Sequence, residues 1–223
     1  ELWATPARAA ALGDFIGRRW FESARRVTRA RGGRAVIVID AGGQEILPRT
    51  TCSLTEDSVE IRAHAVLPAE GRKASGRHSQ PMWLEDLGRI VEAAMVFPPH
   101  AAEAARHVDV AEDYHVLRGL LAERGLVAFI ADGAVLPRDP ASDRPALARL
   151  VTFQAPPELN VTLETPHRGA LSGMGIPRGV TVILGGAFSG RSTLLRAIAS
   201  AVYPHIPGDG REYCAAAPDA VWI

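Results

Sequence analysis

The most informative stretch reads Gly179-Val180-Thr181-Val182-Ile183-Leu184 and continues without a gap into Gly185-Gly186-Ala187-Phe188-Ser189-Gly190-Arg191-Ser192-Thr193. The first part is rich in valine, isoleucine and threonine, which predicts a buried strand. The second part fits the pattern G-x-x-x-x-G-[K]-[ST], with Arg191 where lysine is usual. This pattern predicts a phosphate-binding P-loop.

A helix is predicted directly after this loop. Its apolar residues recur on one helical face until Pro204 forbids continuation, at Leu194, Leu195, Ile198 and Val202. The order of strand, glycine-rich loop and helix is the context that a P-loop requires. The alternative is a flexible strand-to-helix turn without a ligand, which accounts for the glycines but not for the two flanking patterns.

The residue types in the loop suit a bound nucleotide. Glycines let successive backbone N–H groups turn toward an anion, and the N-terminus of the following helix adds positive partial charge at the same point. Ser192 carries the hydroxyl expected to reach Mg²⁺. We therefore expect ATP and Mg²⁺ as ligands, with phosphates bound at Gly185, Gly186, Ala187, Phe188, Ser189, Gly190, Arg191, Ser192 and Thr193.

Arg191 stands where a lysine ordinarily bridges the β- and γ-phosphates. Arginine keeps the charge, but its planar fork is bulkier than an ammonium, which predicts retained binding with slower hydrolysis. The alternative is compositional: Lys73 is the single lysine among 25 basic residues, so a general replacement of lysine by arginine explains Arg191 equally well.

Composition narrows the class of protein. The 223 residues, 47% of them hydrophobic, suffice for one large domain or two small ones. The 25 acidic and 25 basic side chains cancel, so net charge favours neither a nucleic acid nor an acidic membrane surface as partner. We see no signal peptide and no apolar run near the roughly 18 residues of a membrane span, and expect no membrane partner. Cys52 and Cys214 alone predict no disulfide framework or zinc site and favour a reducing cytoplasm.

Periodicity predicts an α/β fold of two domains. Helices are expected over residues 12–31, from 84 to 98, and, separately, over 101–107 and 111–124; strands over 35–39, 59–65, 126–130 and 159–163; and a loop over 69–80. The turn-rich segment 137–145 marks the boundary. We therefore predict a mixed α+β N-terminal domain over residues 1–145 and the start of a P-loop NTPase domain over 146–223.

Several runs are more specific than the P-loop itself. They cover residues 172–181, 192–197 and 205–212 around the loop, and 43–50 and 121–138 upstream. With these runs the chain resembles the bacterial family of predicted ATPases of the ABC class. The resemblance covers most of the chain and implies an ABC-type NTPase domain that binds ATP and Mg²⁺, with hydrolysis by a head-to-tail homodimer of the full-length protein. No transport partner is implied.

The chain departs from the family pattern at Arg191, where the family has lysine, and at Ser189, where it usually has histidine. These departures bear on catalytic turnover and leave the expected fold unchanged. Family members are longer on both sides, so the chain is interpreted as an internal piece. The Walker B, signature and switch residues that follow a P-loop are not found before Ile223, so catalytic residues stay unassigned and we expect no hydrolysis by this piece alone. The signature-like run 171–174 precedes the P-loop and is predicted to be a turn.

An alternative function rests on a basic cluster in and after the first predicted helix: Arg18, Arg19, Arg25, Arg26, Arg29, Arg31 and Arg34. Such a cluster is the electrostatic footprint of an RNA or DNA partner. It would make the chain a nucleic-acid interaction module with a regulatory or degenerate nucleotide site. A solvated helix face explains it as well, and pairing of these arginines with acidic residues would remove the footprint.

The seven histidines show no pair at a convincing metal-ligand spacing. His167 precedes the P-loop, in the region where ABC proteins place a residue against the adenine. We expect it to be a solvated loop residue.

Overall fold

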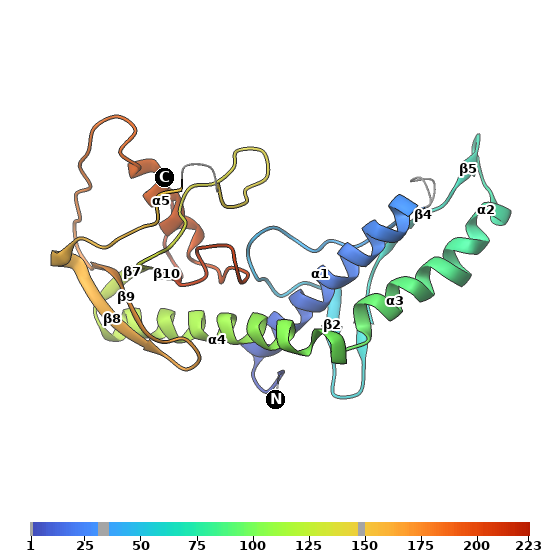
Figure 1. Ribbon diagram of the computed structural model, residues 1–223, viewed down its shortest axis with the longest axis horizontal. Helices are drawn as coiled ribbons and strands as arrows, with labels where there is room; N and C mark the ends of the chain where they lie inside the picture. The colour runs from blue at the N-terminus through green and yellow to red at the C-terminus, as the bar shows by residue number, and fades with distance from the viewer. Residues whose placement is uncertain (1, 31–35, 147–149) are drawn as a thin grey trace. The chain divides into compact units, whose positions relative to one another are not determined.

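The computed structural model describes residues 2–30, 36–146 and 150–223. The chain divides into two compact units. Unit 1 consists of Glu1–Gly42 and Pro48–Ala105, and unit 2 of Gly43–Leu47 and Arg106–Ile223. Figure 1 labels most of their helices and strands.

Unit 1 combines several helices with short antiparallel strand pairs. Helix α1 (Pro6–Ala30) starts with a proline, whose missing N–H costs nothing in the first helical turn. The pairs are β1 (Val36–Val38) with β4 (His64–Val66), β2 (Cys52–Leu54) with β3 (Val59–Ile61), and β5 (Ala69–Glu70) with β6 (Lys73–Ala74). The predicted strand over 59–65 is thus two strands, and the residue at 35 lies outside the described part of the chain.

The second helical segment of unit 1 begins earlier than predicted. Helix α2 (Gly76–Pro81) continues through a π-helical turn (Met82–Asp86) into α3 (Leu87–Met95). The prediction of a loop over 69–80 is therefore wrong, because β5, β6 and most of α2 lie there. The core that fixes this arrangement joins α1 to α3 and the strand region: Trp20, Ala24, Ile37, Ile39, Met82, Ile90 and Ala94.

Helix α4 (Ala101–Glu123) follows a 3₁₀ turn at Pro98–His100. It is one helix where two were predicted. Val108, Val110 and Ala111 are buried, so packing holds the helix together across β-branched residues whose intrinsic helix propensity is low. The division between the two units falls within this helix.

Unit 2 contains a four-stranded antiparallel sheet of order β10-β7-β9-β8. Its strands are β7 (Leu126–Ala131), β8 (Asn160–Thr165), β9 (Gly169–Pro177) and β10 (Cys214–Ala216). β7 and β8 confirm two predicted strands. The run 171–174, predicted to be a turn, lies inside β9. Gly173 shows why: a Cβ there would overlap the carbonyl oxygen of Ile130 on β7, so glycine permits this close strand contact.

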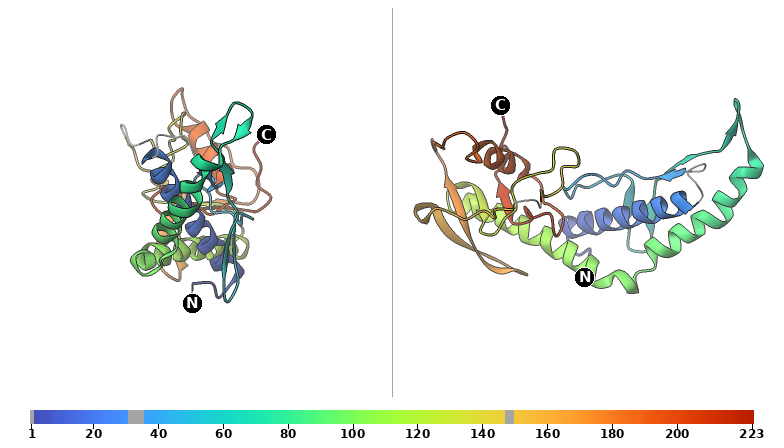
Figure 2. Two further views of the ribbon diagram at one scale, coloured as in Figure 1. Left: turned by 90° about the vertical axis from the view of Figure 1, so that its right-hand side faces the viewer. Right: turned by 45° about the horizontal axis from the view of Figure 1, so that its top comes forward.

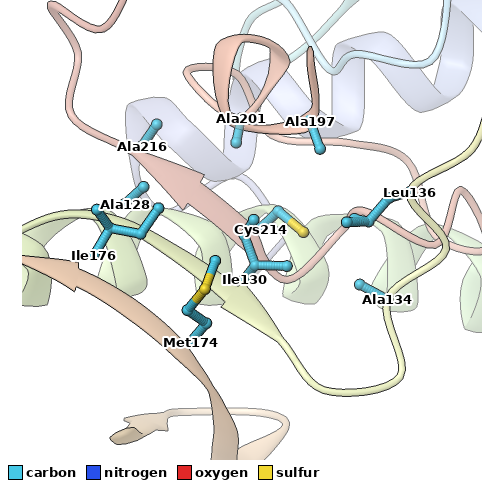
Figure 3. Packing of buried hydrophobic residues seen from close by; sticks show 10 residues of the cluster. All are labelled: Ala128, Ile130, Ala134, Leu136, Met174, Ile176, Ala197, Ala201, Cys214 and Ala216. Atoms are coloured by element: carbon cyan, nitrogen blue, oxygen red, sulfur yellow. The ribbon is translucent and has the colours of Figure 1, made fainter. Parts of the chain in front are cut away.

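The two faces of this sheet bury different helices, because successive strand residues point to opposite sides. On one face Tyr114, Leu117 and Leu121 of α4 pack against the sheet, and the β8–β9 hairpin lies along this helix (Figure 2). On the other face lies α5 (Arg191–Ser200). Figure 3 shows this second cluster, formed by Ala128, Ile130, Ala134, Leu136, Met174, Ile176, Ala197, Ala201, Cys214 and Ala216.

The predicted buried strand over residues 179–184 is wrong. The structure assigns no strand there, and Val180, Val182 and Leu184 are 96%, 71% and 85% exposed. A strand forms only when a neighbouring strand takes up its N–H and C=O groups. Within the described residues, the sheet of unit 2 ends at β8 on one side and β10 on the other, and neither pairs with this run.

Candidate functional site

The glycine-rich loop leads directly into α5, as the sequence predicted. Helix α5 begins at Arg191, and the Leu194 N–H donates to the Gly190 carbonyl at 2.9 Å. Gly190 caps the helix in a left-handed conformation, with φ of 87°. A side chain would be strained there, so glycine suits this position. Phe188 has a positive φ of 61° although it is not glycine, and its side chain is fully exposed.

The loop curls back on itself before the helix. A Cβ on Gly185 would overlap the Ser189 hydroxyl, so the two residues lie in contact. The Ser189 N–H donates to the Gly186 carbonyl at 3.4 Å, and the Arg191 guanidinium donates to the same oxygen, also at 3.4 Å. Arg191 therefore lies over the loop rather than extending away from it.

The loop residues predicted to bind phosphate all lie on the surface. Residues 185–192 are exposed and Thr193 is half-buried. Arg191, Ser192 and Thr193 form the first turn of α5, where backbone N–H groups have no acceptor within the helix. Exposed N–H groups at a helix N-terminus can bind an anion.

The opposite end of α5 is held by several hydrogen bonds. The Ala201 carbonyl accepts from the Tyr114 hydroxyl at 3.0 Å and from the Ala216 N–H at 2.8 Å. Arg211 donates to the Ser200 hydroxyl at 2.9 Å. Burial raises the pKa of Tyr114 to about 12, so its hydroxyl keeps the proton it donates. These bonds fix the helix and therefore the position of the loop at its other end.

A buried charge network lies beside this anchored end. Asp209 accepts from Arg138 at 2.5 Å and lies 2.7 Å from the His205 ring nitrogen Nδ1, and the side chains of Asp209 and His205 are almost fully buried. His205 Nε2 in turn lies 3.4 Å from the Ser200 carbonyl of α5. Residues 205–212 belong to a run that resembles the family, but the sequence did not predict this network. Arg138 is too distant from them in the sequence for any local pattern to indicate the pairing.

Arg211 extends the network into the core. Its guanidinium donates to the Leu136 carbonyl, and burial, followed by the positive charge of Arg138, lowers its pKa. The neighbouring Cys214 is fully buried, and burial raises the pKa of its thiol to about 12. A protonated thiol is a poor nucleophile and a poor metal ligand, so Cys214 serves packing.

Three arginines of the basic cluster, all in α1, lie close to acidic side chains. Arg18 lies 2.6 Å from Asp14, Arg19 lies 3.7 Å from Glu103, and Arg25 lies 3.5 Å from Glu22. Arg31 and Arg34 lie outside the described residues. The pairing reduces the positive footprint that a nucleic acid would use, so the geometry gives no specific support to the nucleic-acid alternative.

An apolar cavity of about 350 Å³ lies in unit 1, lined by residues such as Leu12, Phe15, Val59 and Phe97. None of the P-loop residues lines it. Its walls are mostly apolar, which does not suit a nucleotide phosphate.

His167 lies in the turn between β8 and β9, as a loop residue, but its ring is not simply solvated. Its Nε2 atom lies 2.6 Å from Oε2 of Glu112 and 3.6 Å from Oδ1 of Asp109. The ring therefore contacts α4.

Two protein-family models match this chain, one in each half. A family model described as the N-terminal part of an ATPase of the ABC class matches residues 1–98, and a model described as an ABC ATPase P-loop domain matches residues 100–223. A search of curated proteins finds no match. Within the described residues, no helix is long and apolar enough to cross a membrane. The chain belongs to the ABC-class ATPase family of nucleotide-binding P-loop proteins.

Proposed function

We propose that residues 185–193 bind the phosphates of ATP, with Mg²⁺ held by the Ser192 hydroxyl. The observation that carries this proposal is the exposed N-terminus of α5, which directly follows the exposed glycine-rich loop. Membership of the P-loop family supports the same ligand. The first-turn amides and the helix dipole supply affinity without any side chain, so binding does not require lysine at position 191.

Arg191 has a defined part in this proposal. Its guanidinium donates to the Gly186 carbonyl, a neutral acceptor on the surface. A phosphate oxygen is a stronger, charged acceptor for the same donor. Arg191 is therefore proposed to exchange this carbonyl for the β- or γ-phosphate when nucleotide binds.

We further propose that hydrolysis takes place in a head-to-tail homodimer of the full-length protein, in the cytoplasm and without a transport role. The free, buried Cys52 and Cys214 fit a reducing compartment. The dimer is tested by sedimentation of the full-length protein with and without MgATP. ATP-dependent dimers support the proposal, and a monomer at saturating MgATP contradicts it.

Binding is tested by isothermal titration calorimetry with ATP, ADP and AMP, each with and without Mg²⁺. We expect ATP and ADP to bind and AMP to bind much more weakly, because the loop contacts phosphates beyond the first. Ser192→Ala should weaken binding only in the presence of Mg²⁺, since its hydroxyl is proposed to contact the ion. Equal binding of AMP and ATP, or no effect of Ser192→Ala with Mg²⁺, contradicts the assignment.

A further inference from the structure

A mixed cluster of three side chains lies on unit 2, on the side of the sheet opposite α5. Asp109 and Glu112 stand one helical turn apart on α4, and His167 reaches them from the β8–β9 turn. One oxygen of each carboxylate and one ring nitrogen all lie within 4.8 Å of one another. Residues three apart on a helix share a face, so both carboxylates approach the histidine from the same side.

The backbone that carries His167 is fixed by the same helix. Asp113, which follows Glu112 directly and is only 1% exposed, accepts the backbone N–H groups of His167 and Arg168, each at 2.9 Å. This buried carboxylate holds the turn against α4 independently of the imidazole. The three ligand atoms are thus brought together by two elements whose relative position is already set, which lowers the entropic cost of capturing an ion.

We propose that Asp109, Glu112 and His167 form a binding site for a divalent transition-metal ion of the Zn²⁺ type. A tetrahedral Zn²⁺ with ligands at about 2.0–2.1 Å separates its ligand atoms by roughly 3.3 Å. The separations here are 2.6 Å for His167 Nε2 to Glu112 and 3.6 Å for the same nitrogen to Asp109. Both separations differ from this value by under about 1 Å, and the third, between the two carboxylates, is at most 4.8 Å.

The ligand types determine which ion fits. Imidazole nitrogen with two carboxylate oxygens suits Zn²⁺ and related ions, whereas Mg²⁺ and Ca²⁺ prefer ligand sets made of oxygen. Each side chain is about a third exposed, at 33%, 29% and 35%, so water can complete the coordination. Binding replaces the contact between the imidazole Nε2 and Glu112, and the neutral imidazole that binds the ion through Nε2 carries its proton on Nδ1. Two carboxylates balance the charge of the ion.

The expected consequence is structural. The β8–β9 hairpin contributes Leu163 and Leu171 to the core that α4 covers. An ion held by α4 and the turn of this hairpin would fasten the two elements at a second point. The site is separate from the proposed Mg²⁺ position at Ser192, which lies in α5 on the other face of the sheet.

The test is titration of the metal-free full chain with Zn²⁺, without nucleotide, by isothermal titration calorimetry and thermal unfolding. We expect one Zn²⁺ per chain and a Tm raised by a few degrees. Asp109→Asn, Glu112→Gln and His167→Gln should each weaken binding by about tenfold or more. His64→Gln, a substitution at an exposed histidine of unit 1, is the matched control and should bind as the unaltered chain does.

Co²⁺ provides a second readout. It should give the visible absorption of a tetrahedral site without a thiolate-to-cobalt band, because no cysteine takes part. Absence of stoichiometric Zn²⁺ binding, or binding that the three variants leave unchanged, would overturn the proposal. Circular dichroism of each variant verifies that it is folded, so a loss of binding reports on the ligands themselves.

Discussion

Asp209→Ala tests the claim that the buried charge network holds the anchored end of α5. The change removes the acceptor of Arg138 at 2.5 Å and the neighbour of His205 at 2.7 Å. Both partners stay buried: the side chains of Arg138 and His205 are 11% and 2% exposed. Burial and the positive charge of Arg138 already lower the pKa of Arg211. Without Asp209, these two positive side chains would lie near each other with no carboxylate between them.

The magnitude follows from this geometry. Breaking a buried ion pair by removing one partner costs about 3–5 kcal/mol, because the remaining charge is buried without compensation. Arg138 keeps bonds to the backbone carbonyls of Asp209 at 3.0 Å and Val135 at 3.4 Å, which soften the loss. We therefore expect the lower end, about 3 kcal/mol. Removing Arg138 as well should recover part of it, since no unpaired guanidinium remains.

The assay is urea unfolding of the full chain followed by circular dichroism. Asp219→Ala is the matched control because Asp219 is exposed, and it should change the free energy of unfolding by less than about 0.5 kcal/mol. A loss for Asp209→Ala no larger than for this control would refute the reasoning. It would mean that the network contributes nothing to the support of α5.

Three further predictions concern the P-loop, the sheet of unit 2, and the buried thiol and tyrosine hydroxyl groups. Arg191→Lys in the full-length protein should raise kcat with little change in nucleotide affinity, and an unchanged kcat would favour the compositional explanation of Arg191. Gly173→Ala should lower Tm strongly, because its Cβ would overlap the Ile130 carbonyl; Gly76→Ala, where a Cβ meets nothing within 4 Å, is the control. The contribution of Cys52, Cys214 and Tyr114 to stability should be fully present below pH 9 and be lost between pH 9 and 12, because burial raises the pKa of each group above its value in the unfolded chain. In Tyr114→Phe, the loss of stability between pH 10 and 12 should be smaller. An unaltered pH profile would contradict the raised pKa of this hydroxyl.

The elements that the sequence predicted correctly are those whose cause is local. β7 and β8 follow from short apolar patterns, and α5 from its periodicity and its glycine cap. Residues 179–184 carry the same kind of strand pattern, but a strand also needs a partner, which no local pattern supplies. Two separate helices were predicted where the structure has the single helix α4. The helix continues through Val108 and Val110 because these residues are buried by tertiary packing, which a local pattern does not show.

The functional residues divide in the same way. The P-loop could be found because its chemistry requires a fixed spacing along the chain, and its ligand contacts stay a prediction. The pairing of Arg138 with Asp209, and of His167 with Glu112, joins residues distant in sequence, so no single-sequence pattern could reveal it. The domain boundary near 145 also stays a prediction.

The most direct test of nucleotide binding at the loop is a comparison of two glycine variants. Gly190 and Gly71 are both exposed, both left-handed, with φ of 87° and 63°, and a Cβ on either meets nothing within 4 Å. Valine strains the backbone similarly at both positions, but Gly190 lies in the loop and Gly71 in a turn of unit 1. Calorimetric titration with MgATP should show binding by the unaltered chain and by Gly71→Val, and a loss of about tenfold or more in Gly190→Val. Equal affinity in both variants, or no binding by the unaltered chain, would contradict the assignment of the loop as the nucleotide site.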